Sequence, residues 1–287
     1  MVLGECRAAV EDRLAALVPP GETNLARAMH AAVSSPGKRL RPALVLLVGR
    51  AHGRPLAGLV DVACTVELIH AASLLLDDLP CMDDAELRRG RPTVHRQFGE
   101  AVAILAAFAL LARAQALLAE ALAAVGLAPT YRDEMLRRCA EVIDHLCRGQ
   151  ALDLELAGGQ ADLGRLESIH TLKTGALFEF AAELGAVTSG LTGATLETLL
   201  AFARNLGLAF QVGDDLLDAS GSPAEVGKTL HRDATLGRTT FVSVFGVDGA
   251  RALRDELLDA ARAALAPLGA KSTLLVELIE VVRVRTS

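Results

Sequence analysis

Apolar residues recur every three to four positions along most of the chain, which is the spacing of amphipathic helices. Short segments rich in Gly, Pro and Ser, such as residues 35–37 and 158–159, separate the predicted helices. No long linker or low-complexity tract divides the chain, so we expect one all-α domain over residues 1–287. The predicted helices are Glu5–Leu17, Asn24–Ser34, Arg41–His52, Leu59–Asp78, Gly99–Val125, Tyr131–Ala157, Leu166–Thr188, Ala194–Asp218 and Ala250–Leu265.

Composition favours a helical core. Hydrophobic residues make up 52% of the chain, yet aromatic residues make up only 3% and Trp is absent. Ala and Leu, which are strong helix formers, must therefore fill the core, whereas a sheet protein uses more β-branched and aromatic residues. Several predicted helices are apolar nearly all round, which indicates helices packed around a central one or a subunit interface.

Charge and cysteine content narrow the function classes. The net charge is −6 and no basic stripe with interleaved aromatics occurs, which argues against a nucleic-acid partner. The five cysteines are scattered without a CxxC pair, so neither a zinc site nor a disulfide framework is indicated, and a cytoplasmic location fits. The N-terminus lacks an apolar signal core. The longest apolar stretch, Ala101–Ala112, is shorter than the roughly 18 residues of a membrane span, so we expect none.

The first of two acidic clusters follows three leucines at the end of a predicted helix and holds Asp77, Asp78, Asp83 and Asp84. Desolvating carboxylates beside leucines is costly. A bound cation removes that cost, and carboxylate oxygens suit Mg²⁺, which usually shares its shell with substrate phosphates.

The second cluster, Asp214, Asp215 and Asp218, also ends an apolar helix. Asp214 and Asp218 share one helix face, where like charges destabilise the helix. One cluster alone is equally well a solvated helix end. Two favour a pair of acidic faces opposed across a cavity, holding several Mg²⁺ ions around one diphosphate.

Basic residues accompany the acids. Arg88 and Arg89 follow the first cluster, where guanidinium groups can bind phosphate oxygens through paired hydrogen bonds. Lys38 and Arg41 stand at a predicted helix start, where the helix dipole disfavours cations unless an anion is bound. His70, taken by itself, is typical of a buried core histidine.

Taken together, these motifs resemble the trans-isoprenyl diphosphate synthases of the polyprenyl synthetase family, in particular bacterial geranylgeranyl diphosphate synthases. The run Val66–His95 carries the strongest likeness, and five separated motifs follow the family order between Gly37 and about Thr240. The resemblance implies the isoprenoid synthase fold, a helical bundle around a central active-site cavity. It also implies a homodimer, with isopentenyl diphosphate and allylic diphosphates as substrates and Mg²⁺ as cofactor, three ions per site.

Residue roles come from the same resemblance. The metal ligands are the DDxxxxD and DDxxD motifs, Asp77, Asp78, Asp83, Asp214, Asp215 and Asp218. The residues expected to hold isopentenyl diphosphate are Lys38, Arg41, His70 and Arg89, with Arg238 where the family usually has lysine. The residues expected to act on the allylic diphosphate and its cation are Arg88, Lys173, Thr174, Gln211 and Lys228. Gln150 and Asp153 match an element of the cavity wall, or an ordinary helix-end network.

Pocket depth is expected to set product length. In the family an aromatic residue at the place of Ala72 stops growth at C15, so the small Ala72, with Ser73 beside it, favours a C20 product. Phe108 on the neighbouring helix is a hypothetical deeper floor. The alternatives are a farnesyl diphosphate synthase, a longer-chain synthase, a class I terpene cyclase and a non-catalytic partner subunit. The last two fit less well, because the chain keeps both aspartate clusters and Gly37–Pro42.

Overall fold

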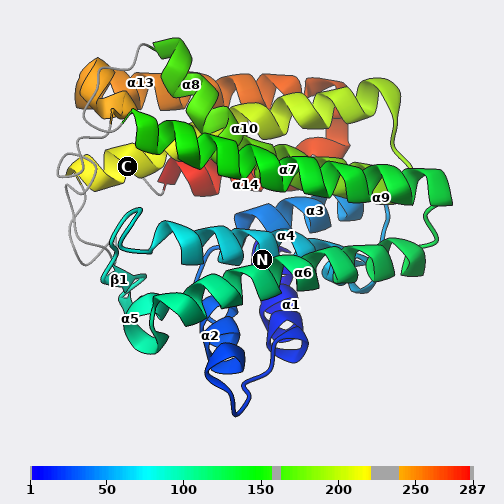
Figure 1. Cartoon of the computed structure of the whole chain (residues 1–287). Helices are drawn as coiled ribbons and strands as arrows, with labels where there is room; N and C mark the ends of the chain where they lie inside the picture. The colour runs from blue at the N-terminus through cyan, green and yellow to red at the C-terminus, as the bar shows by residue number, and fades with distance from the viewer. Residues whose placement is uncertain (1, 157–162, 221–238, 285–287) are drawn as a thin grey trace. The chain divides into compact units, whose positions relative to one another are not determined.

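The computed structural model describes residues 2–156, 163–220 and 239–284 (Figure 1). Contacts divide the chain into two compact units, Met1–Cys139 and Ala140–Ser287. Nearly all regular structure in the described ranges is helical, as the sequence predicts. A single domain over the whole chain stays a prediction.

The first unit is built around helix α4, which packs against α1, α3 and α6. Both faces of α4 are apolar, so most of its middle is buried, including Val62, Val66, Leu68 and Ile69. Each such aliphatic side chain contributes about 1.5–3 kcal/mol when removed from water. The elements of this unit are α1 (Val2–Leu17), α2 (Asn24–Val33), α3 (Leu40–Ala51), α4 (Leu56–Asp77), β1 (Leu87–Arg88), β2 (Arg91–Pro92), α5 (Val94–Phe98) and α6 (Glu100–Ala124).

Helix α7 (Pro129–Glu155) crosses the boundary between the units. It begins with proline, whose missing N–H has no helical partner to lose in the first turn.

The second unit is built around the long helix α10, which packs against α9 and α13. Leu166, Val212, Leu216, Phe241 and Ala250 form one of its buried apolar clusters. A capping box between Thr240 and Ser243 fixes the start of α13. The elements are α8 (Leu163–His170), the π-helix η1 (Thr171–Gly175), α9 (Ala176–Thr188), α10 (Gly193–Ser220), α13 (Phe241–Ala264), the 3₁₀ segment η2 (Ala266–Ser272) and α14 (Thr273–Val284).

The structure departs from the predicted elements in several places. Residues 87–92 form a hairpin, and a π-helix interrupts the helix predicted over Leu166–Thr188. Helix α13 begins at Phe241, nine residues before the predicted start, because a first helical segment precedes a kink at Gly246, where φ is 70°. Helices α5 and α14 and the 3₁₀ segment η2 were not among the predicted helices.

Two helices, α4 and α6, are long and apolar enough to cross a membrane by length and composition alone. The sequence predicted no membrane span because its longest uninterrupted apolar run was too short. Helix α6 is longer than that run, because it continues through the charged residues Arg113 and Glu120. In α4, 67% of the most apolar stretch is buried, whereas in α6 the buried share of that stretch is 39%. Helix α4 is thus the core helix of its unit, while α6 leaves apolar side chains uncovered.

Candidate active site

The turn at the end of α4 brings Asp77 and Asp83 of the first cluster together. The chain turns back after Asp77, and the backbone N–H of Asp83 donates to the carbonyl of Asp77 at 2.9 Å. Both side chains are half-buried. The five residues between them therefore form a turn that places two carboxylate-bearing residues side by side.

Asp78 has a different environment. It is buried, and its Oδ1 accepts hydrogen bonds from Arg88 Nε at 3.0 Å and from Arg88 Nη2. Burial opposes the charge of Arg88, but the carboxylates of Asp78, Asp77 and Asp83 outweigh it and raise the pKa of Arg88. The sequence predicts Asp78 as a metal ligand, and that role stays a prediction; in the structure its Oδ1 is the partner of Arg88.

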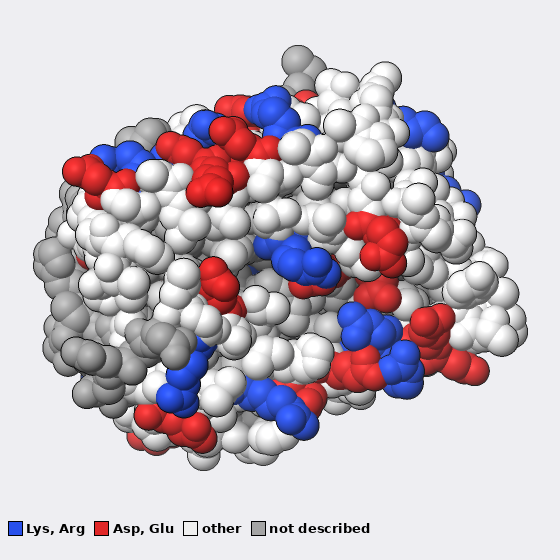
Figure 2. Space-filling model, turned by 90° about the horizontal axis from the view of Figure 1, so that it is seen from above, with Lys and Arg blue, Asp and Glu red and all other residues white. Residues whose placement is uncertain are grey.

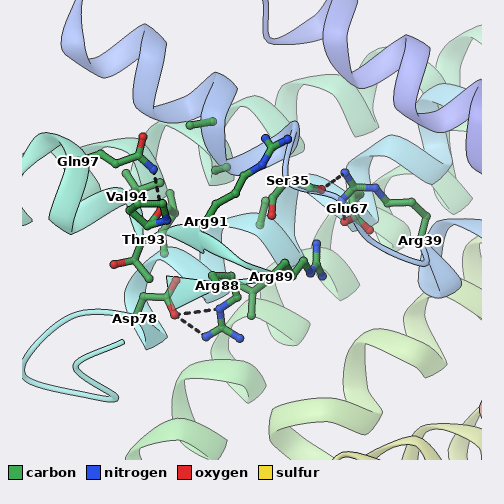
Figure 3. A pocket seen from close by; sticks show the side chains of 16 residues that line it. Ser35, Arg39, Glu67, Asp78, Arg88, Arg89, Arg91, Thr93, Val94 and Gln97 are labelled. Atoms are coloured by element: carbon green, nitrogen blue, oxygen red, sulfur yellow. Dashed lines mark hydrogen bonds and ion pairs between the residues drawn. The ribbon is translucent and has the colours of Figure 1, made fainter. Parts of the chain in front are cut away.

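A two-residue turn makes the neighbouring side chains of Arg88 and Arg89 point in different directions (Figure 3). In the hairpin Arg88 lies opposite Arg91, and the turn residues Arg89 and Gly90 have φ of 55° and 77°. Positive φ at both central residues is typical of a type I′ turn, which favours glycine at the second position. Arg88 points to Asp78 and Arg89 points away from it (Figure 3).

Arg89 reaches the loop before α3. A Cβ built on Gly37 would lie only 2.7 Å from Arg89 Nη1, so the guanidinium occupies the space that a larger residue needs. Arg88 and Arg89 thus approach two different groups, the first acidic cluster and the segment Gly37–Pro42.

Arg41 lies beside His70. Arg41 Nη1 is 3.5 Å from His70 Nε2, and because an arginine only donates, that nitrogen is the acceptor. Burial, followed by the charges of Arg41, Arg89, Arg88 and Arg39, lowers the pKa of His70 well below its usual value. His70 is therefore a neutral imidazole in a positive environment. Lys38 is exposed nearby in sequence.

A cavity of about 110 Å³ lies in the first unit (Figure 3). It extends between the hairpin and residues of α2, α4 and α5, and its polar lining includes residues that the sequence reading did not single out. Arg39 and Glu67 form a buried ion pair at one side of it. The lining comprises Ala31, Ala32, Ser35, Arg39, Glu67, Ala71, Leu74, Leu75, Asp78, Arg88, Arg89, Arg91, Pro92, Thr93, Val94 and Gln97.

The second acidic cluster, like the first, combines a buried aspartate with half-buried ones. Asp214 and Asp218 are half-buried, but Asp215 is buried. Asp215 Oδ1 accepts from Gln211 Nε2 at 3.0 Å, and its Oδ2 accepts from the backbone N–H of Phe241 at 2.9 Å. The sequence predicts Asp215 as a metal ligand, and that role stays a prediction; in the structure its carboxylate joins α10 to the first residue of α13.

The π-helix carries Lys173 and Thr174. Lys173 Nζ is 2.6 Å from Asp153 Oδ2, and Thr174 Oγ1 donates to Gln211 Oε1 at 2.8 Å. Gly149 on α7 makes this approach possible, because a Cβ there would lie 2.5 Å from the backbone N of Lys173. Thr174, Gln211 and Asp215 therefore form one chain of hydrogen bonds.

His170 precedes the π-helix and packs against Phe241, with ring centroids 5.1 Å apart. It is buried, and neither ring nitrogen has a hydrogen-bond partner among the residues that the structure describes. Burial lowers its pKa to about 4, with Lys173 adding to the effect and Asp153 opposing it. His170 is thus held neutral.

The chemistry of these carboxylates fits Mg²⁺ bound in part by other ligands. Among the described residues, no group of three or more His, Cys, Asp or Glu side chains is arranged to hold a metal ion. Mg²⁺ is usually bound through one or two carboxylates plus water and phosphate oxygens. The adjacent Asp77 and Asp83 could supply such a partial shell, and Asp214 and Asp218 offer a similar pair of half-buried carboxylates one helical turn apart.

The residues expected to set product length differ in exposure. Ala72 is fully buried in the packing of α4, whereas its neighbour Ser73 is half-buried and donates to the carbonyl of His70 at 2.9 Å. Phe108 on α6 is 65% exposed. Of the three residues, Phe108 thus has the least enclosed surroundings. Lys228 and Arg238, two further expected phosphate contacts, lie outside the described residues.

The surface charges are mixed. On the face drawn in Figure 2, acidic and basic side chains alternate with uncharged surface, and the described residues there form no continuous basic stripe.

Comparison with known proteins identifies the family. The model of the polyprenyl synthetase family matches residues 22–271. This chain belongs to the polyprenyl synthetase family. This synthetase is 42% identical to the geranylgeranyl diphosphate synthase of Pseudescherichia vulneris over 262 residues, which cover 89% of this chain and 82% of that one. It is also 42% identical to the farnesyl diphosphate synthase of Escherichia coli over 263 residues, which cover 91% and 88%.

A solved structure gives the same assignment. The geranyltransferase of Helicobacter pylori, crystallised with magnesium and isoprenyl diphosphate, superposes on this synthetase with a TM-score of 0.83 at 29% identity, covering 98% of this chain and 96% of that one. The fold is therefore the isoprenoid synthase fold, and the family activity is that of a trans-prenyl diphosphate synthase. The relatives' names divide between farnesyl and geranylgeranyl products, so the comparisons support no single chain length.

Proposed function

We propose that this synthetase condenses isopentenyl diphosphate head-to-tail with allylic diphosphates and releases geranylgeranyl diphosphate and inorganic diphosphate. The observation that carries the proposal is the divergence of Arg88 and Arg89. One arginine adjoins the first acidic cluster and the other adjoins the Gly37–Pro42 loop. Two separate groups of phosphate-binding residues suit a reaction with two diphosphate substrates.

The allylic diphosphate belongs with the acidic cluster in this proposal. Mg²⁺ bound with it supplies positive charge that stabilises the leaving diphosphate. Asp77 and Asp83 would hold the ion, and Arg88, fixed by Asp78, would donate to phosphate oxygens. Since charge develops on the leaving group in the transition state, fixed donors lower the barrier to ionisation. The magnesium named with the Helicobacter pylori protein supports this cofactor.

Isopentenyl diphosphate belongs with Lys38, Arg41, Arg89 and His70. The exposed Lys38 and the two arginines compensate the diphosphate charge. His70, neutral because of its burial and the surrounding arginines, accepts from Arg41 and orients it. A phosphate bound here would thus contact basic side chains whose direction is already fixed.

The residues of the π-helix act on the allylic cation in this proposal. Gln211 presents a neutral amide oxygen that accepts from Thr174, so neither group carries a negative charge that would trap a carbocation. Lys173, held by Asp153, contributes a cation toward the diphosphate. Isopentenyl diphosphate attacks through its double bond, and the released diphosphate takes the proton lost at the end of the cycle.

Geranylgeranyl diphosphate is the proposed product because no aromatic residue occupies position 72 or 73. Farnesyl diphosphate is the alternative, and a longer product is less well supported. Phenylalanine at the half-buried position 73 should shorten the product. Ala72→Phe should do the same, but Ala72 is fully buried, so that variant also strains the core.

The test is product analysis by chromatography for the wild type, Ser73→Phe and Ala72→Phe, with Phe108→Ala as a third variant. A C20 product that shortens to C15 in Ser73→Phe supports the proposal. A C15 product from the wild type, or an unchanged C20 product from a folded Ser73→Phe variant, would overturn the product-length argument. Longer products from Phe108→Ala would support a floor at Phe108.

We further propose a cytoplasmic homodimer. Ile104, Leu105 and Phe108 expose an apolar stripe on α6, with Leu105 57% exposed. Such an exposed apolar stripe is typical of a subunit interface. Sedimentation analysis should show a dimer for the wild type and a weaker dimer for Leu105→Lys. A monomeric wild-type protein would contradict the proposal.

A further inference from the structure

Arg39 differs from the two cations that flank it. It lies between Lys38 and Arg41, yet its side chain is buried, with only 5% of the residue exposed. Its backbone has φ 50° and ψ 38° at the N-cap of α3. This left-handed conformation is unfavourable for a residue with a Cβ, so surrounding contacts must hold it.

Those contacts close the loop between α2 and α3. Arg39 Nη2 donates to the carbonyl of Val33 at 2.7 Å and to that of Ser35 at 2.6 Å. Val33 is the last residue of α2, where a cation is favoured by the helix dipole. The guanidinium therefore ties the end of α2 and Ser35 of the loop to the N-cap of α3; the contact with Ser35 is drawn in Figure 3.

The charge of Arg39 is matched by a buried carboxylate. Arg39 Nη1 donates to Glu67 Oε1 on α4, and Glu67 is 3% exposed. Glu11 on α1 lies 3.8 Å from Arg39 Nε. A buried ion pair is strongly dependent on both members, because removing one leaves the other charge uncompensated.

Two contacts consequently join the start of α3 to α4. Arg39 pairs with Glu67, and two residues later Arg41 meets His70, which is one helical turn beyond Glu67. The contact between Arg39 and Glu67 is buried and joins two charged groups. The contact between Arg41 and His70 belongs to the proposed diphosphate site. Arg89 packs on Gly37 in the same loop.

We propose that Arg39 and Glu67 form a positioning pair that fixes the loop conformation in which Lys38, Arg41 and Arg89 bind isopentenyl diphosphate. Neither residue touches the substrate. The pair sets the direction of the cations on either side of Arg39, and its loss affects the site for isopentenyl diphosphate more than the allylic site. This inference rests on the proposed function.

The experiment compares Glu67→Gln and Arg39→Lys with Asp61→Asn. Asp61 lies on the same helix and pairs with Arg13 at 2.5 Å, but in an exposed position, so it is a matched control. Glu67→Gln and Arg39→Lys should raise KM for isopentenyl diphosphate about tenfold, while KM for the allylic substrate changes less than about twofold. Asp61→Asn should leave both unchanged.

A double variant separates positioning from stability. Removing both charges of a buried ion pair costs less stability than removing one, so Arg39→Met with Glu67→Leu should lower Tm less than Glu67→Gln does. It should still show the raised KM, because the carbonyls of Val33 and Ser35 have lost their donor. Restored KM in the double variant, or single variants that lower Tm at unchanged KM, would overturn the inference. A wild-type protein that forms no product would instead refute the proposed function, and this inference with it.

Discussion

Arg88 donates two hydrogen bonds to a single oxygen of Asp78, and both groups are largely buried. The second aspartate of the first cluster thus orients an arginine, while Asp77 and Asp83 on either side are half-buried. Adjacent residues in one acidic motif have different partners, and their substitution should have different consequences.

Asp83→Asn should reduce kcat about 100-fold and raise the Mg²⁺ concentration needed for half-maximal rate, because a metal-binding carboxylate is lost. Asp78→Asn should instead raise KM for the allylic diphosphate with little change in the Mg²⁺ requirement, since it leaves the charge of Arg88 uncompensated. Magnesium titrations of initial rate distinguish the two. Equal shifts in Mg²⁺ requirement would contradict the separate roles.

The same contrast is expected in the second unit. Asp215→Asn replaces one acceptor oxygen with a donor, so either Gln211 or the Phe241 N–H loses its partner. A buried unsatisfied group costs about 1–3 kcal/mol. Chemical denaturation should show that loss for Asp215→Asn. Asp214→Asn, at a half-buried position, should retain stability and raise the Mg²⁺ requirement; the reverse pattern would refute this assignment.

Gly149→Ala should destabilise the protein by about 1–3 kcal/mol and lower activity, since the new methyl group meets the backbone of Lys173. Gly58→Ala on α4 is the control. Its Cβ would meet nothing closer than 3.9 Å among the described residues, and alanine favours the helix by up to about 1 kcal/mol. Thermal unfolding of the two variants measures the difference, and equal Tm values would show that α7 and η1 can move apart without cost.

Stability should fall as the pH drops from about 6.5 to about 4 because of His170. The unfolded chain protonates this residue near 6.5 and the folded protein only near 4, so the unfolded state binds more protons between these values. A pKa difference of that size corresponds to about 3 kcal/mol. Urea unfolding at pH 7.5 and pH 4.5 should therefore show a smaller loss in His170→Phe than in the wild type. An identical loss in both proteins would exclude His170 as the cause.

The helices were largely predictable because their apolar residues follow a clear period. Helix α4 was predicted from Leu59 to Asp78 and runs from Leu56 to Asp77. The start of α13 was missed, because Gly246 and Gly249 interrupt the pattern that identifies a helix. The π-helix has no periodic signature of its own, so the apolar pattern predicted one helix over Leu166–Thr188, and only the family resemblance indicated a helix break at Lys173 and Thr174.

The aspartate clusters were predictable as motifs, but the direction of each side chain was not. Asp77 and Asp78 are neighbours in one motif, and only the packing around the hairpin brings Arg88 to the second of them. In the sequence, Arg39 is a basic residue like its neighbours Lys38 and Arg41. Its backbone is left-handed, however, and its side chain is buried. The signal that could have identified the pair was Glu67, an acidic residue within the apolar core helix α4.

The most direct test of the central claim is product formation by the purified wild-type protein. Mg²⁺, isopentenyl diphosphate and each of the C5, C10 and C15 allylic diphosphates are supplied in turn, and product length is measured with parallel samples containing a chelator. We predict C20 product from these starters and none in the presence of the chelator. No prenyl product from any starter, or undiminished product with Mg²⁺ removed, would contradict the account.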